Sequence, residues 1–219
     1  MLFRDRREAG QVLARTLEHF RNQPNVIVLA LPRGGVPVAY EVARELNLPL
    51  DIFIVRKLGV PGQEELAMGA IASGGTIVMN RSVVDGLAIS HDEIEAAAER
   101  EKLEIERRER GYRHGRAPLQ IEGRTAILVD DGLATGASMR AAARALKPRA
   151  QRVIVAVPVA SESTCEEFRN EVDEIICATT PQPFYAVGMF YHNFEQTTDE
   201  EVTRLLSHAG TNSNAPQAA

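Results

Sequence analysis

Short apolar runs rich in Val and Ile recur along the chain, separated by segments long enough to form a helix. An uninterrupted apolar strand is typical of a sheet covered on both faces, because neither side of the strand meets water. Strands that alternate with helices favour parallel pairing. The runs that we assign to strands cover residues 26–31, 52–55, 125–129, 152–159 and 174–178. The pattern predicts an α/β fold with a mostly parallel central sheet and helices on both faces.

Helix and turn signals fill the intervals between these runs. Residues 8–21 carry apolar side chains at helical spacing, and a long helix over residues 90–112 begins with a capping box of Ser90 and Glu93. That helix is rich in both acidic and basic residues. Before it, residues 58–63 predict a loop and residues 67–79 predict a hairpin. We expect one domain over residues 1–208 and a disordered tail over residues 209–219.

The composition excludes some classes of partner. The net charge is −5, which argues against a general binder of nucleic acid or of an anionic membrane surface. The apolar runs are too short to span a bilayer, and the first residues do not resemble a secretory signal. Cys165 and Cys177 lack metal-type spacing, so we expect two reduced thiols in a cytoplasmic protein.

Two adjacent acids and a loop of small residues follow the apolar run 125–129. Asp130 and Asp131 precede Gly-Leu-Ala-Thr-Gly-Ala-Ser, which opens a helix. Ligands of parallel sheets bind at the carboxyl ends of strands, and the N–H groups of a glycine-containing turn at a helix start bind anions. The carboxylates would repel a phosphate unless they served another group, and the two hydroxyls of a ribose are suitable donors. The segment therefore predicts a site for ribose 5-phosphate.

This segment lacks the glycine spacing of a Walker A loop and of a Rossmann fingerprint. Instead, Val-Asp-Asp-Gly-Leu-Ala-Thr-Gly-Ala-Ser closely resembles the phosphoribosyl pyrophosphate loop of type I phosphoribosyltransferases. The resemblance implies that fold, with a small hood and a helical flap beside the sheet. The residues that it implies for binding phosphoribosyl pyrophosphate in this loop are Asp130, Asp131, Gly132, Leu133, Ala134, Thr135, Gly136, Ala137 and Ser138.

Two basic segments add to the resemblance. Pro-Arg33-Gly34-Gly35 follows the first predicted strand and resembles the turns that bind pyrophosphate in several family members. Glycine allows close approach to an oxyanion, and Arg33 could clamp it with two hydrogen bonds. Arg56 and Lys57 follow the next strand, where a basic residue of the family contacts pyrophosphate. A plain turn and a solvated strand end remain the alternatives for these segments.

The resemblance also implies a reaction. In this class a nucleophile, usually a base nitrogen, displaces pyrophosphate from C1 of the ribose through an oxocarbenium-like transition state. Asp130 and Asp131 would lie near the positive ribose and would serve as ligands of Mg²⁺. Arg33 and Lys57 would stabilise the leaving pyrophosphate. We therefore predict Asp130, Asp131, Arg33 and Lys57 as the catalytic residues and Mg²⁺ as the cofactor.

Two further segments are candidates for covering the site. Residues 58–116 are a candidate lid, although their charged helix could instead be a solvated arm or a homodimer contact. Residues 181–194 are similar to the hood of hypoxanthine-guanine phosphoribosyltransferases, with one residue more between Phe and Gly. Phe184, Tyr185 and Val187 would then contact the acceptor, unless these aromatic residues only pack against the sheet edge.

The loop over residues 130–138, which we call the acid loop, also indicates which acceptor the site would take. Hypoxanthine-guanine enzymes carry a third Asp, which handles the proton on purine N7, where this chain has Ala134. We therefore predict weak or no activity on hypoxanthine and guanine, and a nucleobase or related small molecule as acceptor. The opening Phe-Arg-Asp-Arg-Arg-Glu-Ala-Gly is similar to bacterial phosphoribosyltransferase-like proteins without a settled substrate. The alternatives are a non-catalytic or regulatory nucleotide binder and a phosphoribosyl pyrophosphate hydrolase.

Overall fold

The computed structural model describes residues 2–211 and contains a five-stranded parallel sheet. Its strand order is β2-β1-β6-β7-β8, and every neighbouring pair is parallel. This confirms the predicted α/β class. The strands are β1 (Val26–Ala30), β2 (Leu50–Ile52), β6 (Thr125–Val129), β7 (Arg152–Val159) and β8 (Glu174–Thr179).

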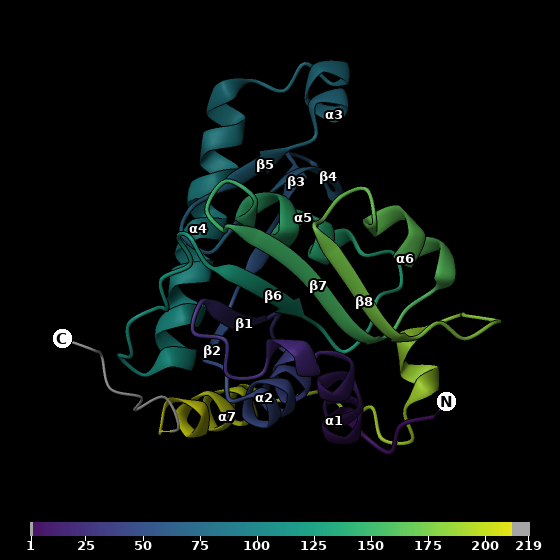
Figure 1. The fold of residues 1–219 in the computed structure, drawn as a ribbon. Helices are drawn as coiled ribbons and strands as arrows, with labels where there is room; N and C mark the ends of the chain where they lie inside the picture. Colours follow the sequence, from purple (N-terminus) through teal and green to yellow (C-terminus); the bar gives the residue numbers. More distant parts are fainter. Residues whose placement is uncertain (1, 212–219) are drawn as a thin grey trace.

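Helices cover both faces of this sheet (Figure 1). Along β1, Val26, Val28 and Ala30 pack into a core shared with α1, α2 and α7. Ile27 and Leu29 point to the opposite face and pack with residues of α5 and α6. Both faces are therefore dry, which explains the continuous apolar runs. The helices are α1 (Arg6–Thr16), α2 (Gly35–Leu46), α5 (Ala137–Leu146), α6 (Glu162–Phe168) and α7 (Asp199–Thr211), with short 3-10 turns at η1 (Glu18–Phe20) and η2 (Val187–Phe190).

A second, antiparallel sheet lies beside the first and corrects one expectation. Its strands are β3 (Val55–Val60), β4 (Gln63–Ala72) and β5 (Ile77–Met79), in that order. The predicted strand 52–55 and loop 58–63 are therefore wrong in their limits. The chain leaves the parallel sheet after Ile52, and Arg56 and Lys57 lie within β3. Gly62, with a φ of +76°, allows the tight turn that pairs β3 with β4.

The charged helix is α4 (His91–Arg113), which follows the short α3 (Arg81–Gly86). Ser90 and Glu93 form the predicted capping box, and Glu104 pairs with Arg108 at 2.6 Å. Residues on one side of α4, such as Ala97 and Ile105, are buried against the small sheet. Figure 1 shows α3 and the first turns of α4 projecting away from the parallel sheet.

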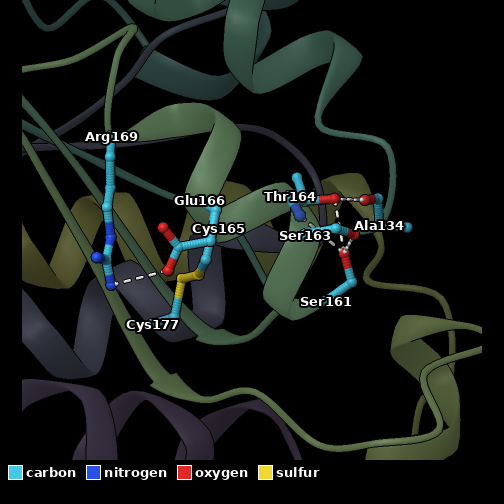
Figure 2. The surroundings of a disulfide bond; sticks show 8 residues. All are labelled: Ala134, Ser161, Ser163, Thr164, Cys165, Glu166, Arg169 and Cys177. Carbon is cyan, nitrogen blue, oxygen red and sulfur yellow. Dashed lines mark hydrogen bonds and ion pairs between the residues drawn. A yellow bond between two sulfur atoms is a disulfide. The ribbon is translucent and has the colours of Figure 1, made fainter.

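Two expectations about the remaining chain are changed. Cys165 of α6 and Cys177 of β8 form a disulfide, so the expectation of two reduced thiols is wrong for this structure (Figure 2). The cause is tertiary, because α6 packs against β8. Residues 209–211 of the predicted tail belong to α7, and residues 212–219 lie outside the described part of the chain. No helix among residues 2–211 is long and apolar enough to cross a membrane.

Candidate active site

The acid loop lies at the carboxyl edge of the parallel sheet, as expected. Strand β6 ends at Val129, and the N–H of Asp131 donates to Oδ1 of Asp130 at 2.8 Å. Leu133 forms an isolated bridge with Ala160, at the end of the neighbouring β7. Gly136 then caps the start of α5 with a φ of +70°, a left-handed conformation that favours glycine. Strand, acids, turn and helix thus follow one another in the predicted order.

Helix α6 packs against this loop and holds it in place, a contact that the sequence did not predict. Thr164 Oγ1 donates to the carbonyl of Ala134 at 2.6 Å, as Figure 2 shows. A Cβ at Gly136 would lie 2.6 Å from the ring of Phe168. Cys165 lies between these two residues in the chain, so the disulfide ties the supporting helix to β8. Ser161 caps the start of α6, where its side chain accepts from the N–H of Thr164.

The Arg-Gly-Gly turn packs directly against the two acids. A Cβ at Gly35 would lie 2.7 Å from the carbonyl oxygen of Val129 and 2.9 Å from Cα of Asp130. A Cβ at Gly34 would overlap the carboxylate of Asp131. Any larger residue would push the two loops apart. The fold therefore brings together two motifs that lie about a hundred residues apart in the sequence, as the resemblance implied.

A second missed residue, Arg6, pairs with the acid loop. Its Nε lies 2.8 Å from Oδ2 of Asp131, and the two side chains are only 12% and 15% exposed. Its guanidinium lies 4.0 Å from the ring centroid of Phe194, and Nη1 donates to the carbonyl of Glu195 at 2.7 Å. The opening Arg-Asp-Arg-Arg string was the only sequence signal for it, and that string does not indicate which arginine reaches the site.

Burial dominates the electrostatics of the acid pair. It raises the pKa of Asp130 well above its usual value, and the neighbouring charge of Asp131 raises it further. It also raises the pKa of Asp131, although the Arg6 guanidinium opposes that shift. Tyr191 donates to the carbonyl of Asp131 at 2.5 Å, and burial raises the pKa of its hydroxyl. Burial thus disfavours the charged form of both acids, and a bound cation or hydroxyl donor would offset that cost.

The three predicted basic residues pair with acids outside the acid loop. Arg33 Nη1 lies 3.7 Å from Asp199 at the start of α7. Arg56 Nε lies 2.7 Å from Glu101 of α4, and Lys57 Nζ lies 3.1 Å from Glu65 of β4. Asp199 belongs to α7, whereas Glu65 and Glu101 belong to the candidate lid over residues 58–116, which we call the flap. In this structure none of these three pairs includes Asp130 or Asp131.

Lys57 nevertheless shares a cavity with the acid loop. This cavity has a volume of about 670 Å³ and lies between the small antiparallel sheet and α5. Lys57 lines it from β3, and Ala137 and Ser138 line it from the start of α5. The flap thus borders the predicted phosphate loop along one side.

The hood forms part of one cluster with the N-terminal segment. The N–H of Phe3 donates to Phe190, and the N–H of His192 donates to Phe3, both at 2.8 Å. Phe184 stacks on Phe190 with ring centroids 5.3 Å apart, so it packs within the hood. Val187 covers the loop, since a Cβ at Gly132 would lie 2.5 Å from its Cγ1. Tyr185 is 75% exposed. Of the three predicted acceptor residues, Val187 contacts the acid loop and Tyr185 is open to a ligand.

Comparison with known proteins identifies the family. Relatives in two strains of Mycobacterium tuberculosis, provisionally named phosphoribosyl transferases, are 44% identical over 209 residues, which is 95% of this chain and 47% of theirs. The chain thus spans about half the length of these relatives. The crystal structure of TT1426 from Thermus thermophilus is 42% identical, covers 95% of this chain and 99% of its own, and superposes with a TM-score of 0.83. The model of the phosphoribosyl transferase domain matches residues 6–193, so the chain belongs to the phosphoribosyl transferase domain family.

Proposed function

We propose that this protein transfers the 5-phosphoribosyl group from Mg·phosphoribosyl pyrophosphate to a nucleobase or related acceptor and releases pyrophosphate. The observation that carries the proposal is the contact between the Arg-Gly-Gly turn and the acid loop. Gly34 and Gly35 lie against Asp131 and Asp130 with no room for a side chain. A pyrophosphate-binding turn and a ribose phosphate loop must be adjacent if one ligand is to occupy both.

Each segment has a part in this proposal. The N–H groups and hydroxyls of residues 132–138 hold the 5′-phosphate, because a glycine-containing turn at a helix start binds anions. Asp130 and Asp131 accept the ribose hydroxyls and stabilise the positive charge that grows on the sugar. Arg33, Arg56 and Lys57 would have to exchange their present carboxylate partners for pyrophosphate oxygens. The Gly34–Gly35 backbone would approach the same group.

The acids fit Mg²⁺ only in a limited way. Mg²⁺ prefers oxygen ligands and keeps several waters, so a carboxylate pair beside phosphates is suitable. However, Asp131 already has Arg6 at 2.8 Å, and no group of three or more potential metal ligands gathers among residues 2–211. We therefore propose that Asp130 and Asp131 supply only a few of the ligands of Mg²⁺, and that phosphate oxygens and waters supply the others. Bound Mg²⁺ would neutralise the pyrophosphate as it leaves.

The acceptor would lie under the hood. Tyr185 is exposed enough to stack on a planar ring, and Val187 borders the acid loop. Phe184 would support them from within the hood. Ala134 has a methyl group where a purine enzyme needs a proton acceptor, and its carbonyl already accepts from Thr164. We propose an acceptor that arrives deprotonated or is activated by another group, with weak or no turnover of hypoxanthine and guanine.

A non-catalytic nucleotide binder is the second candidate. The observation that favours it is the pairing of Arg56 with Glu101 and of Lys57 with Glu65, which occupies two of the predicted pyrophosphate contacts. Such a protein would bind ribose 5-phosphate through the acid loop and would not release pyrophosphate.

We also propose that the protein is cytoplasmic and forms a homodimer.

One series of measurements tests both candidates. Calorimetry with ribose 5-phosphate and with Mg·phosphoribosyl pyrophosphate would establish binding, and an assay of pyrophosphate release with a panel of bases would establish turnover. We expect both ligands to bind and at least one base to stimulate release. Binding without release for any base would favour the regulatory candidate. Absence of binding by both ligands would contradict the proposed function.

A further inference from the structure

Arg6 links four segments that are separate in the sequence. It opens α1, pairs with Asp131 of the acid loop, and contacts Phe194 at the end of the hood and the following Glu195. A Cβ at Gly34 would lie 3.5 Å from its Nε, so the Arg-Gly-Gly turn is also adjacent. We propose that Arg6 is a positioning residue that holds the Asp131 carboxylate for recognition of the ribose hydroxyls. This inference rests on the proposed function, because it assigns a role within the same site.

The contacts restrict Asp131 in both its main chain and its side chain. Tyr191 donates to its carbonyl, and Arg6 binds Oδ2 of its carboxylate. Gly34 lies against the same Oδ2 and blocks movement in that direction. Arg6 is the one side chain of residues 2–211 that hydrogen-bonds to this carboxylate, and it binds Oδ2, so Oδ1 faces no competing side chain. A carboxylate already fixed in one orientation loses less conformational freedom when a hydroxyl binds it.

Arg6 is itself held by groups that suit a guanidinium. Its Nε and Nη1 donate in different directions, to Asp131 and to the carbonyl of Glu195, while its flat face covers Phe194. A lysine ammonium could not stack on the ring or make both hydrogen bonds in this geometry. Arg6 also lies in the first turn of α1, where a positive charge is unfavourable because the helix dipole is positive at that end. Its contribution to the helix therefore does not explain its position, whereas its contact with the acid does.

The decisive readout is discrimination among sugars. Calorimetry would compare ribose 5-phosphate with its 2-deoxy and 3-deoxy analogues, which retain the phosphate and lack one hydroxyl. We expect the wild-type protein to prefer ribose 5-phosphate. In Arg6→Gln the affinity for ribose 5-phosphate should fall about tenfold or more, while that for the analogue without the recognised hydroxyl changes little, so that the preference is lost. Arg6→Lys, which keeps the charge without the fork, should give an intermediate preference.

Arg4→Gln is the matched control. Arg4 lies two residues earlier, is 74% exposed and pairs only at 3.7 Å with Glu8, so its loss should leave every affinity unchanged. A wild-type protein that binds none of the three sugars would contradict the proposed function. If the wild type discriminates and Arg6→Gln discriminates equally, or loses affinity for all three sugars by the same factor, the positioning role is wrong. Should Arg6→Gln fail to fold, Arg6→Lys decides, and wild-type discrimination in Arg6→Lys would overturn the proposal.

Discussion

The acid loop and the flap, both predicted to contact the same ligand, are built in opposite ways. The acid loop has close contacts on several sides, from Gly34, Gly35, Val187 and Phe168. The flap hairpin between β3 and β4 is exposed over residues 61–66, and Gly62 has no atom within 4 Å of its Cβ position. The loop is thus preformed by packing, whereas the flap tip has few contacts to hold it. Rigid loops suit the recognition of phosphate and ribose, and a loosely held hairpin suits a cover that moves.

The glycines of the two regions give the largest expected difference. Gly136 and Gly62 both have a positive φ, but only Gly136 faces another side chain. Gly136→Val should strain the turn and clash with Phe168, and we expect the affinity for ribose 5-phosphate to fall on the order of a hundredfold. The clash lies beneath the loop, so the mutation acts by displacing the turn rather than by direct contact with phosphate.

Gly62→Val is the matched control for this change. It carries a similar backbone strain without the clash, so it should lower stability by about 1 kcal/mol and leave the affinity for ribose 5-phosphate unchanged. Calorimetry and thermal unfolding of both variants would measure this. Equal affinities in the two variants would show that the Phe168 contact does not shape the site.

Replacing either acid should reduce turnover, but the two replacements should change the stability of the protein differently. Asp130→Asn and Asp131→Asn should each reduce turnover on the order of a hundredfold, because the developing charge on the ribose loses a carboxylate. Asp130→Asn should leave stability unchanged or higher, since burial already disfavours its charge. Asp131→Asn should be less stable, because it leaves the mostly buried Arg6 without its acid.

Steady-state assays and urea unfolding would measure these effects. Normal turnover in the double variant would exclude the acid loop as the reaction site. Greater loss of stability in Asp130→Asn than in Asp131→Asn would contradict the assigned partner of Arg6.

Lys57 tests whether strand β3, which leads into the flap, contributes to binding pyrophosphate. Lys57→Met removes the charge that now pairs with Glu65. We expect the affinity for Mg·phosphoribosyl pyrophosphate to fall about tenfold, with that for ribose 5-phosphate unchanged, because only the first ligand carries pyrophosphate. Lys102→Met on α4, whose lysine pairs with Glu99 at 3.3 Å, is the control. Unchanged binding of both ligands to Lys57→Met would restrict Lys57 to its pair with Glu65.

The smallest expected effect is on the motion of the flap. Hydrogen exchange of residues 58–68 should slow when Mg·phosphoribosyl pyrophosphate binds, if the hairpin closes over the cavity that it shares with Ser138. Residues 125–129 of the parallel sheet are the internal reference, since they are buried and should exchange equally slowly in both states. Identical exchange of residues 58–68 with and without ligand would contradict the lid role.

Local patterns predicted the parts of the molecule that depend on neighbours in sequence. The apolar runs, the Ser90 capping box and the strand–loop–helix order around Asp130 all have local causes, and the structure contains them. The error at residues 52–60 has a different cause. Whether Val55–Val60 extends β2 or pairs with β4 depends on which partner it meets, and so short a segment carries no information about its partner.

By itself, the sequence determined the parallel sheet, the position of the acid loop at its carboxyl edge and the glycines that allow tight turns there. Only the tertiary structure decided that Arg6 reaches Asp131 rather than solvent, that Thr164 and Phe168 support the loop, and that Cys165 meets Cys177. The physical reason is the range of the interactions. Hydrophobic periodicity and capping act within a few residues of the chain, whereas an ion pair, a supporting contact or a disulfide forms only after packing has brought distant segments together.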